Sequence, residues 1–186
     1  NPGRTHDSLS TPLPPTGSGS SVSAQPLVPK FSDWSEPVNL GPSVNSTDPD
    51  LSPTLSPDNL SLYFGSNRPA GIGGYDIWVS RRACVHCPWE APVNLGPVIN
   101  STLHDNAGEM SPDGYLLFFA SGRAGGYGDH DIYVSRRTDL NDDFCWQTPV
   151  NLGPVINTSS DDVAPDIANV DGSTAIMYFS RGRNAG

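Results

Sequence analysis

The stretch Trp-Glu-Ala-Pro-Val-Asn-Leu-Gly-Pro-Val-Ile-Asn, at residues 89–100, recurs with small changes along the chain. Its copies begin at Trp34, Trp89 and Trp146, so the chain contains a tandem repeat of roughly 55 residues. A repeat of this length predicts like supersecondary units, each of which buries an apolar face against its neighbour. The repeat therefore constrains the architecture more strongly than any local motif does.

Four short strands are predicted in each repeat. The first two are joined by Ser-Pro-Asp-Asn at residues 56–59 and by Ser-Pro-Asp-Gly at residues 111–114, which suit type I turns because proline presets φ. The second strand alternates Leu62 and Phe64 with Tyr63, as a pleated strand requires. Helical periodicity is not sustained anywhere, and 19 glycines and 19 prolines disfavour helices. The expected fold class is therefore all-β.

The fourth strand of each repeat is expected at Pro-Val-Asn-Leu-Gly-Pro. Proline cannot donate a hydrogen bond to a neighbouring strand, so it belongs on edge strands or at strand ends. Proline at both ends of this stretch therefore predicts the outermost strand of a four-stranded antiparallel sheet. It also blunts an edge that would otherwise pair with another chain.

The repeats resemble the WD40-like, TolB-like propeller repeats of bacterial envelope and secreted proteins in three motifs: Ser-Pro-Asp-Gly-x-Leu-Leu-Phe-Phe-Ala-Ser-Gly-Arg, Gly-Gly-x-Gly-Asp-x-Asp-Ile-Tyr-Val-Ser-Arg-Arg, and Trp-x-x-Pro-Val-Asn-Leu-Gly-Pro-Val-Ile-Asn. The similarity covers residues 31–186. It implies that the four-stranded sheets are blades of a β-propeller. It also implies a periplasmic, cell-surface or secreted location.

The chain divides into a tail and the repeats. Residues 1–30 are rich in Pro, Ser and Gly and poor in apolar residues, which predicts a disordered linker. The repeats comprise an outer strand at 31–45, blades at 46–100 and 101–157, and a partial blade at 158–186. Propellers typically have four to eight blades, so we expect an incomplete propeller fragment, with self-association if the propeller stays incomplete.

The charge of the chain limits its partners. A net charge of −10 disfavours nucleic acid and anionic membranes. No stretch approaches the roughly 20 apolar residues of a membrane-spanning helix. The sequence also lacks a recognisable nucleophile–base set, phosphate loop or metal motif, so no catalytic residue, metal or cofactor is predicted.

Three cysteines leave their pairing open. Cys84 and Cys87 form a Cys-x-x-Cys pair beside His86, and Cys145 directly precedes Trp146. The favoured interpretation is one local or inter-blade disulfide and a spare thiol. A zinc half-site with His86 and a redox pair are the alternatives, although a second Cys pair that would complete a zinc site is absent.

Five acidic residues are the candidate ligand-binding set. Three precede the innermost strand of successive repeats and two lie within such strands; they are Asp50, Asp105 and Asp162, and Glu109 and Asp166. In a propeller the innermost strands line the central channel, so these carboxylates would ring its mouth and attract cationic groups. The alternative is that they cap turns and stay solvated.

Other residues recur as a structural signature. Trp34, Trp89 and Trp146 are expected to pack between blades, with glycan stacking as the alternative. Asp76 and Asp131 are expected to accept backbone N–H bonds from glycine-rich loops, with a metal site as the alternative. Arg68, Arg123 and Arg183 are expected to pair with aspartates between blades or to stack on aromatic rings, with a carboxylate-binding rim as the alternative.

The expected function is a non-enzymatic, extracytoplasmic binding or scaffolding module for a protein or peptide. This follows from the resemblance to TolB-like repeats. The alternative is the propeller part of a hydrolase, either linked to a peptidase or active on glycans, with its catalytic acids among Asp105, Glu109 and Asp166. A purely structural spacer is a third possibility.

Overall fold

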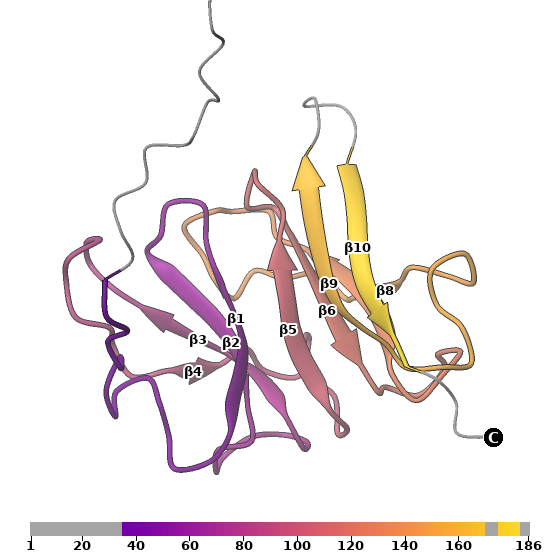
Figure 1. Ribbon diagram of the computed structural model, residues 1–186, viewed down its shortest axis with the longest axis horizontal. Helices are drawn as coiled ribbons and strands as arrows, with labels where there is room; N and C mark the ends of the chain where they lie inside the picture. Colours follow the sequence, from indigo (N-terminus) through magenta and orange to yellow (C-terminus); the bar gives the residue numbers. More distant parts are fainter. Residues whose placement is uncertain (1–34, 170–174, 183–186) are drawn as a thin grey trace, which may run out of the picture. The chain divides into compact units, whose positions relative to one another are not determined.

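A computed structural model describes residues 35–169 and 175–182 of the chain (Figure 1). Within these residues the fold is all-β and contains no helix. The expected fold class is confirmed at this level. The linker predicted at residues 1–30 and the repeat residues Trp34 and Arg183 lie outside the described residues.

The described residues form two four-stranded antiparallel sheets and one two-stranded sheet. The first sheet has the order β1 (Asp50–Leu55), β2 (Ser61–Ser66), β3 (Asp76–Arg81), β4 (Val93–Asn94). The second has the order β5 (Asp105–Met110), β6 (Leu116–Ser121), β7 (Asp131–Arg136), β8 (Val150–Asn151). The third pairs β9 (Asp162–Asn169) with β10 (Ala175–Arg181). Each sheet thus lies within one of the predicted repeats.

The Ser-Pro-Asp turns close the first hairpin of each full sheet through side-chain bonds. Ser56 Oγ donates to Asp58 Oδ1 at 2.6 Å and accepts the backbone N–H of Ser61 at 2.9 Å. The last turn residue, Asn59 or Gly114, has a positive φ of 61° or 77°. Asn and Gly tolerate this left-handed conformation at low cost, which explains their presence there.

The Pro-Val-Asn-Leu-Gly-Pro motif forms the outermost strands β4 and β8, each only two residues long. Its first copy behaves differently. The prediction of an outer strand at 31–45 is wrong for residues 35–45, which lie in no strand. A fourth strand needs a third strand as its hydrogen-bonding partner, and no described strand precedes residue 50.

A β-bulge interrupts the first strand of each of the three described sheets. The register shifts between Leu51 and Thr54 in β1 and between Ala107 and Glu109 in β5. A shift of the same kind separates the pairs formed by Tyr178 and Ser180 with β9. An extra residue in one strand bends it and redirects its side chains. The bulges therefore determine the side of its own sheet to which each residue of β1, β5 and β9 points.

The largest apolar core lies between the first two sheets. It joins Tyr63, Ile77 and Val79 of the first sheet to Leu117 and Phe119 of the second. The strands β5 and β9 each pack against the preceding sheet, so β5 lies between β1 and β9 (Figure 1). Face-to-face packing of like sheets is what the tandem repeat predicts.

Candidate functional site: an acidic row on the innermost strands

The first strands of the three described sheets, β1, β5 and β9, bring three equivalent positions into one row. Thr54 pairs with Tyr63, Glu109 with Phe118, and Asp166 with Tyr178, so each lies just past the bulge of its own strand. We call Thr54, Glu109 and Asp166 the acidic row. Thr54 is buried, Glu109 is half-buried and Asp166 is exposed. The row therefore opens toward solvent at the β9 end.

Electrostatic coupling along the row affects Glu109 most. Burial raises the pKa of Glu109, and the neighbouring Asp166 carboxylate raises it further. Hydrogen bonds from the Thr54 side chain and from the backbone of Met110 partly oppose this shift. A half-buried carboxylate beside a like charge is a group that gains from a cationic partner.

This coupling predicts a pH-dependent gain from Glu109→Gln. The pKa of Glu109 is higher in the folded state than in the unfolded state. At a pH above the folded-state pKa, the ionised carboxylate therefore destabilises the folded protein. At a pH below the unfolded-state pKa, Glu109 is protonated in both states and the destabilisation disappears. We expect Glu109→Gln to raise the free energy of unfolding at pH 7 by less than about 1 kcal/mol, since the group is partly solvated. Urea titrations at pH 7 and pH 4 check this; an equal gain at both would contradict the coupling.

The other three predicted ligand residues form internal ion pairs. Asp50 accepts from Arg68 Nη2 at 2.7 Å, and Asp105 accepts from Arg123 Nη2 at 2.9 Å. Asp105 is also fully buried and accepts from the hydroxyl of Ser101 at 2.7 Å. Burial alone would raise the pKa of Asp50, but hydrogen bonds from Ser66 and Arg68 outweigh it and lower the pKa. The oxygens of these carboxylates are thus occupied within their own repeat.

In the third repeat the arginine comes earlier than the sequence alignment suggests. Asp162 is fully buried and accepts from Arg181 Nε at 2.6 Å, while Arg181 Nη2 donates to the Ile156 carbonyl at 2.6 Å. Arg68 makes the same pair of contacts with Asp50 and the Val44 carbonyl. The sequence predicts Arg183 for this role, as the counterpart of Arg68 and Arg123 after the second strand, whereas the residue that makes these contacts is Arg181, the last residue of β10.

The guanidinium groups also stack on aromatic rings. Arg68 lies over Phe64 at 4.9 Å and Arg123 over Tyr133 at 4.9 Å. The same side chains that bind Asp50 and Asp105 therefore cover the aromatic face of their own sheets. Such planar stacking with simultaneous ion pairing is available to arginine and not to lysine.

Asp76 and Asp131 cap the glycine-rich loops that precede them. Asp76 accepts the backbone N–H groups of Ile72 and Gly73, and Asn94 Nδ2 donates to it at 3.0 Å. Asp131 accepts at 2.6 Å from the backbone N–H of Tyr127 and at 2.8 Å from Asn151 Nδ2. Both carboxylates are buried. Their hydrogen bonds tie the loop and the outermost strand to the third strand.

Two copies of the repeated tryptophan differ in burial. Trp146 is buried in the core between the first two sheets, with its ring 6.1 Å from that of Tyr63 in an edge-on arrangement. Trp89 is only partly buried, at the margin of a smaller cluster of Val44, Leu62, Phe64 and Trp78. The difference arises because a sheet covers Trp146 and none of the described sheets covers Trp89.

A buried charged network that sequence reasoning missed joins the first two sheets. Asp143 accepts from Arg137 Nη1 at 2.9 Å, from Arg81 Nε at 2.5 Å, from Ser61 Oγ at 2.8 Å and from the Tyr63 hydroxyl. Arg137 is only 2% exposed. Burial and the Asp143 carboxylate raise the pKa of Tyr63. Asp143 lies in the loop before Trp146, which is two residues longer than the loop before Trp89 and has the acid where that loop has His86, so periodicity gives no signal for it.

Cys84 and Cys87 form a disulfide, and Cys145 is a free thiol. This arrangement matches the local disulfide with one spare cysteine that the sequence favoured.

Among residues 35–169 and 175–182, no group of three or more His, Cys, Asp or Glu side chains has an arrangement that would hold a metal ion. The same part of the chain contains no helix with the length and apolar character needed to cross a bilayer.

Comparisons with known proteins add no family to this description. A scan against protein-family models finds no match, and a search of curated proteins finds no relative.

Proposed function

We propose that the chain is part of a WD40-like, TolB-like β-propeller that binds a protein or peptide partner outside the cytoplasm, without catalysing a reaction. The all-β fold, the two four-stranded antiparallel sheets and the side-by-side placement of β1, β5 and β9 support a radial arrangement of blades. The Cys84–Cys87 disulfide supports a periplasmic, cell-surface or secreted location, because disulfides persist in oxidising compartments.

The acidic row carries the proposal for binding. Its two carboxylates come from neighbouring strands, and no ion pair joins Glu109 or Asp166 to a basic side chain of the described residues. The negative potential at this row favours a lysine or arginine side chain of a partner. Neutralisation by such a group would also relieve the repulsion that raises the Glu109 pKa.

A cationic peptide tests the proposal directly. We expect a fluorescent tetralysine peptide to bind the chain at low salt, and we expect Glu109→Gln with Asp166→Asn to weaken this binding by at least about tenfold. The matched control is Asp139→Asn with Asp142→Asn, which removes the same charge from two exposed acids. Fluorescence anisotropy measures both.

Equal losses in the two double variants would contradict the proposal, because they would mean that net charge alone attracts the peptide. Unchanged binding in the Glu109 and Asp166 variant would contradict it as well.

The raised pKa of Glu109 next to an exposed carboxylate also favours one second candidate, the propeller part of a hydrolase. Turnover of a peptide or an oligosaccharide that Glu109→Gln abolishes would support this second candidate instead.

A further inference from the structure

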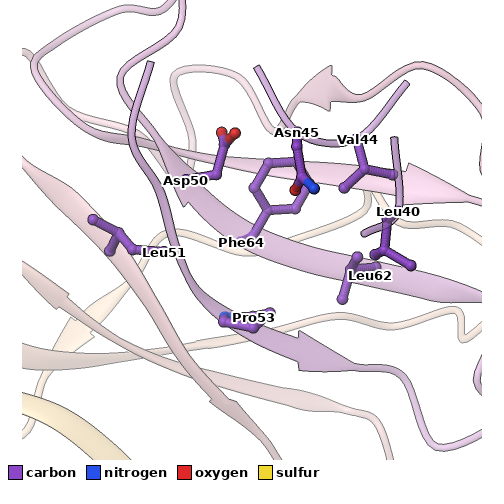
Figure 2. Close-up of a pocket in the computed structure, with 8 residues that line it drawn as sticks. All are labelled: Leu40, Val44, Asn45, Asp50, Leu51, Pro53, Leu62 and Phe64. Carbon is purple, nitrogen blue, oxygen red and sulfur yellow. The ribbon is translucent and has the colours of Figure 1, made fainter. Parts of the chain in front are cut away.

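The first sheet has an apolar face that no other described sheet covers. A cavity of about 130 Å³ opens on this face, and Leu40, Val44, Leu62 and Phe64 are among the residues that line it (Figure 2). Leu40 is 47% exposed, whereas Val44, Leu62 and Phe64 are buried. We call these four residues the open face.

The second sheet shows what fills such a face. Its equivalents of Leu40, Val44, Leu62 and Phe64 are Leu95, Ile99, Leu117 and Phe119. Those four residues lie in one buried cluster with Tyr63, Ile77 and Val79 of the first sheet. Leu95 is 5% exposed, against 47% for Leu40. In the second sheet, residues of a neighbouring sheet thus cover the position that Leu40 leaves exposed in the first.

An arginine–tryptophan pair beside the open face repeats the internal contact. Arg82 lies over Trp89 at 4.3 Å, and its Nε donates to the Asn59 carbonyl at 2.8 Å. Arg137 lies over Trp146 at 5.3 Å, and its Nε donates to the Gly114 carbonyl at 2.7 Å. Between the first two sheets, Tyr63 packs against the Arg137–Trp146 pair, and its hydroxyl accepts a hydrogen bond from Arg137 Nη1 at 3.1 Å.

The opposite end of the sheet stack presents the matching tyrosine. Tyr178 of β10 pairs with Asp166 as Tyr63 of β2 pairs with Thr54, so the two tyrosines hold equivalent positions. Tyr63 is fully buried, whereas Tyr178 is 61% exposed. Ile176 on the same strand is exposed as well. Among the described residues, both halves of a contact that the chain already forms internally are thus exposed.

We propose that two copies of this chain associate head to tail, with Tyr178 of one copy against Trp89, Arg82 and the open face of the other. The contact joins two different surfaces, so repetition leads to closed rings or to open chains of copies. It does not involve the acidic row and does not depend on the proposed ligand.

The contact is expected to be weaker than its internal counterpart. The third sheet has two described strands, and neither supplies equivalents of Ile77 and Val79, which come from the third strand of the first sheet. His86 precedes Trp89 at the spacing at which Asp143 precedes Trp146, so the carboxylate of the internal network has no equivalent. Small interfaces of this kind give transient association.

Sedimentation velocity at increasing protein concentration tests the association with two single variants. Tyr178→Ser removes the tyrosine and Leu40→Glu places a charge in the open face; both side chains are substantially exposed, so both variants should fold. We expect each variant to weaken self-association by at least about tenfold. Tyr127→Ser, which removes another exposed tyrosine, is the matched control and should associate as the unmodified chain does.

A mixture of the two variants gives the decisive result. Each variant keeps one intact surface, so a head-to-tail contact predicts that the equimolar mixture forms dimers and nothing larger. A monomeric unmodified chain at every concentration would overturn the proposal. So would undiminished association of either variant, or a mixture that stays monomeric, which would indicate a contact through identical surfaces.

Discussion

Asp143→Ala is expected to lower the free energy of unfolding by about 3–5 kcal/mol, the range for a buried ion pair that loses one partner. The substitution leaves the guanidinium of Arg137, 2% exposed, without its carboxylate and removes the acceptor of the Ser61 and Tyr63 hydroxyls. Urea or thermal unfolding followed by tryptophan fluorescence measures the loss. Asp142→Ala, at the exposed neighbouring residue, should cost less than about 1 kcal/mol.

A second substitution separates two causes of the lost stability: the unpaired buried charge of Arg137 and the removal of the Asp143 side chain itself. Replacing Arg137 by Met in the Asp143→Ala background removes the unpaired cation and should recover part of the lost stability. The double variant would then be more stable than the sum of the two single losses predicts. If Asp143→Ala costs no more than Asp142→Ala, the network does not hold the first two sheets together.

Trp146→Ala is expected to cost about 3–5 kcal/mol, as for other large side chains removed from a packed core. Trp89→Ala removes the equivalent residue of the preceding repeat but should cost only about 1–2 kcal/mol, because Trp89 is partly buried. The two residues hold the same place in one motif, and they differ in the sheet that covers Trp146 and in the hydrogen bond from its indole to the Asp143 carbonyl. Chemical denaturation at low protein concentration, where copies of the chain are dissociated, measures both losses.

Equal costs for the two tryptophans under those conditions would contradict the packing described here. A cost for Trp89→Ala that grows with protein concentration would instead reflect the proposed association, because a second copy would then cover this side chain. The concentration series therefore separates the packing within one chain from the contact between copies.

The sequence predicts much of the fold because each copy of the repeat carries the same turn and strand signals. The Ser-Pro-Asp turns, the alternation around Tyr63 and the prolines that flank Val93 and Val150 are local signals, and each acts through the backbone. The strand expected at residues 31–45 was wrong in its described part because strand formation there depends on a partner strand, which a local motif does not report.

The candidate site was harder to predict, because equivalent acids have different neighbours. Asp105 and Glu109 are both acidic and close in sequence, yet Asp105 is bound by Arg123 and Ser101 while Glu109 faces Asp166. The pairing follows from the side of the bulge on which each residue lies. Asp143 gives no periodic signal, because the loop before Trp146 is two residues longer than the loop before Trp89, which has His86 at the matching spacing from its tryptophan.

Successive copies of the repeat fold as like sheets, and the first two of these sheets pack face to face. Nuclear Overhauser contacts between the Tyr63 ring and the Trp146 indole test it most directly, because these rings come from neighbouring sheets and their centroids lie 6.1 Å apart. We predict cross-peaks between the two rings in the folded protein. A folded protein with dispersed resonances and no contact between these rings would contradict the packing of the sheets.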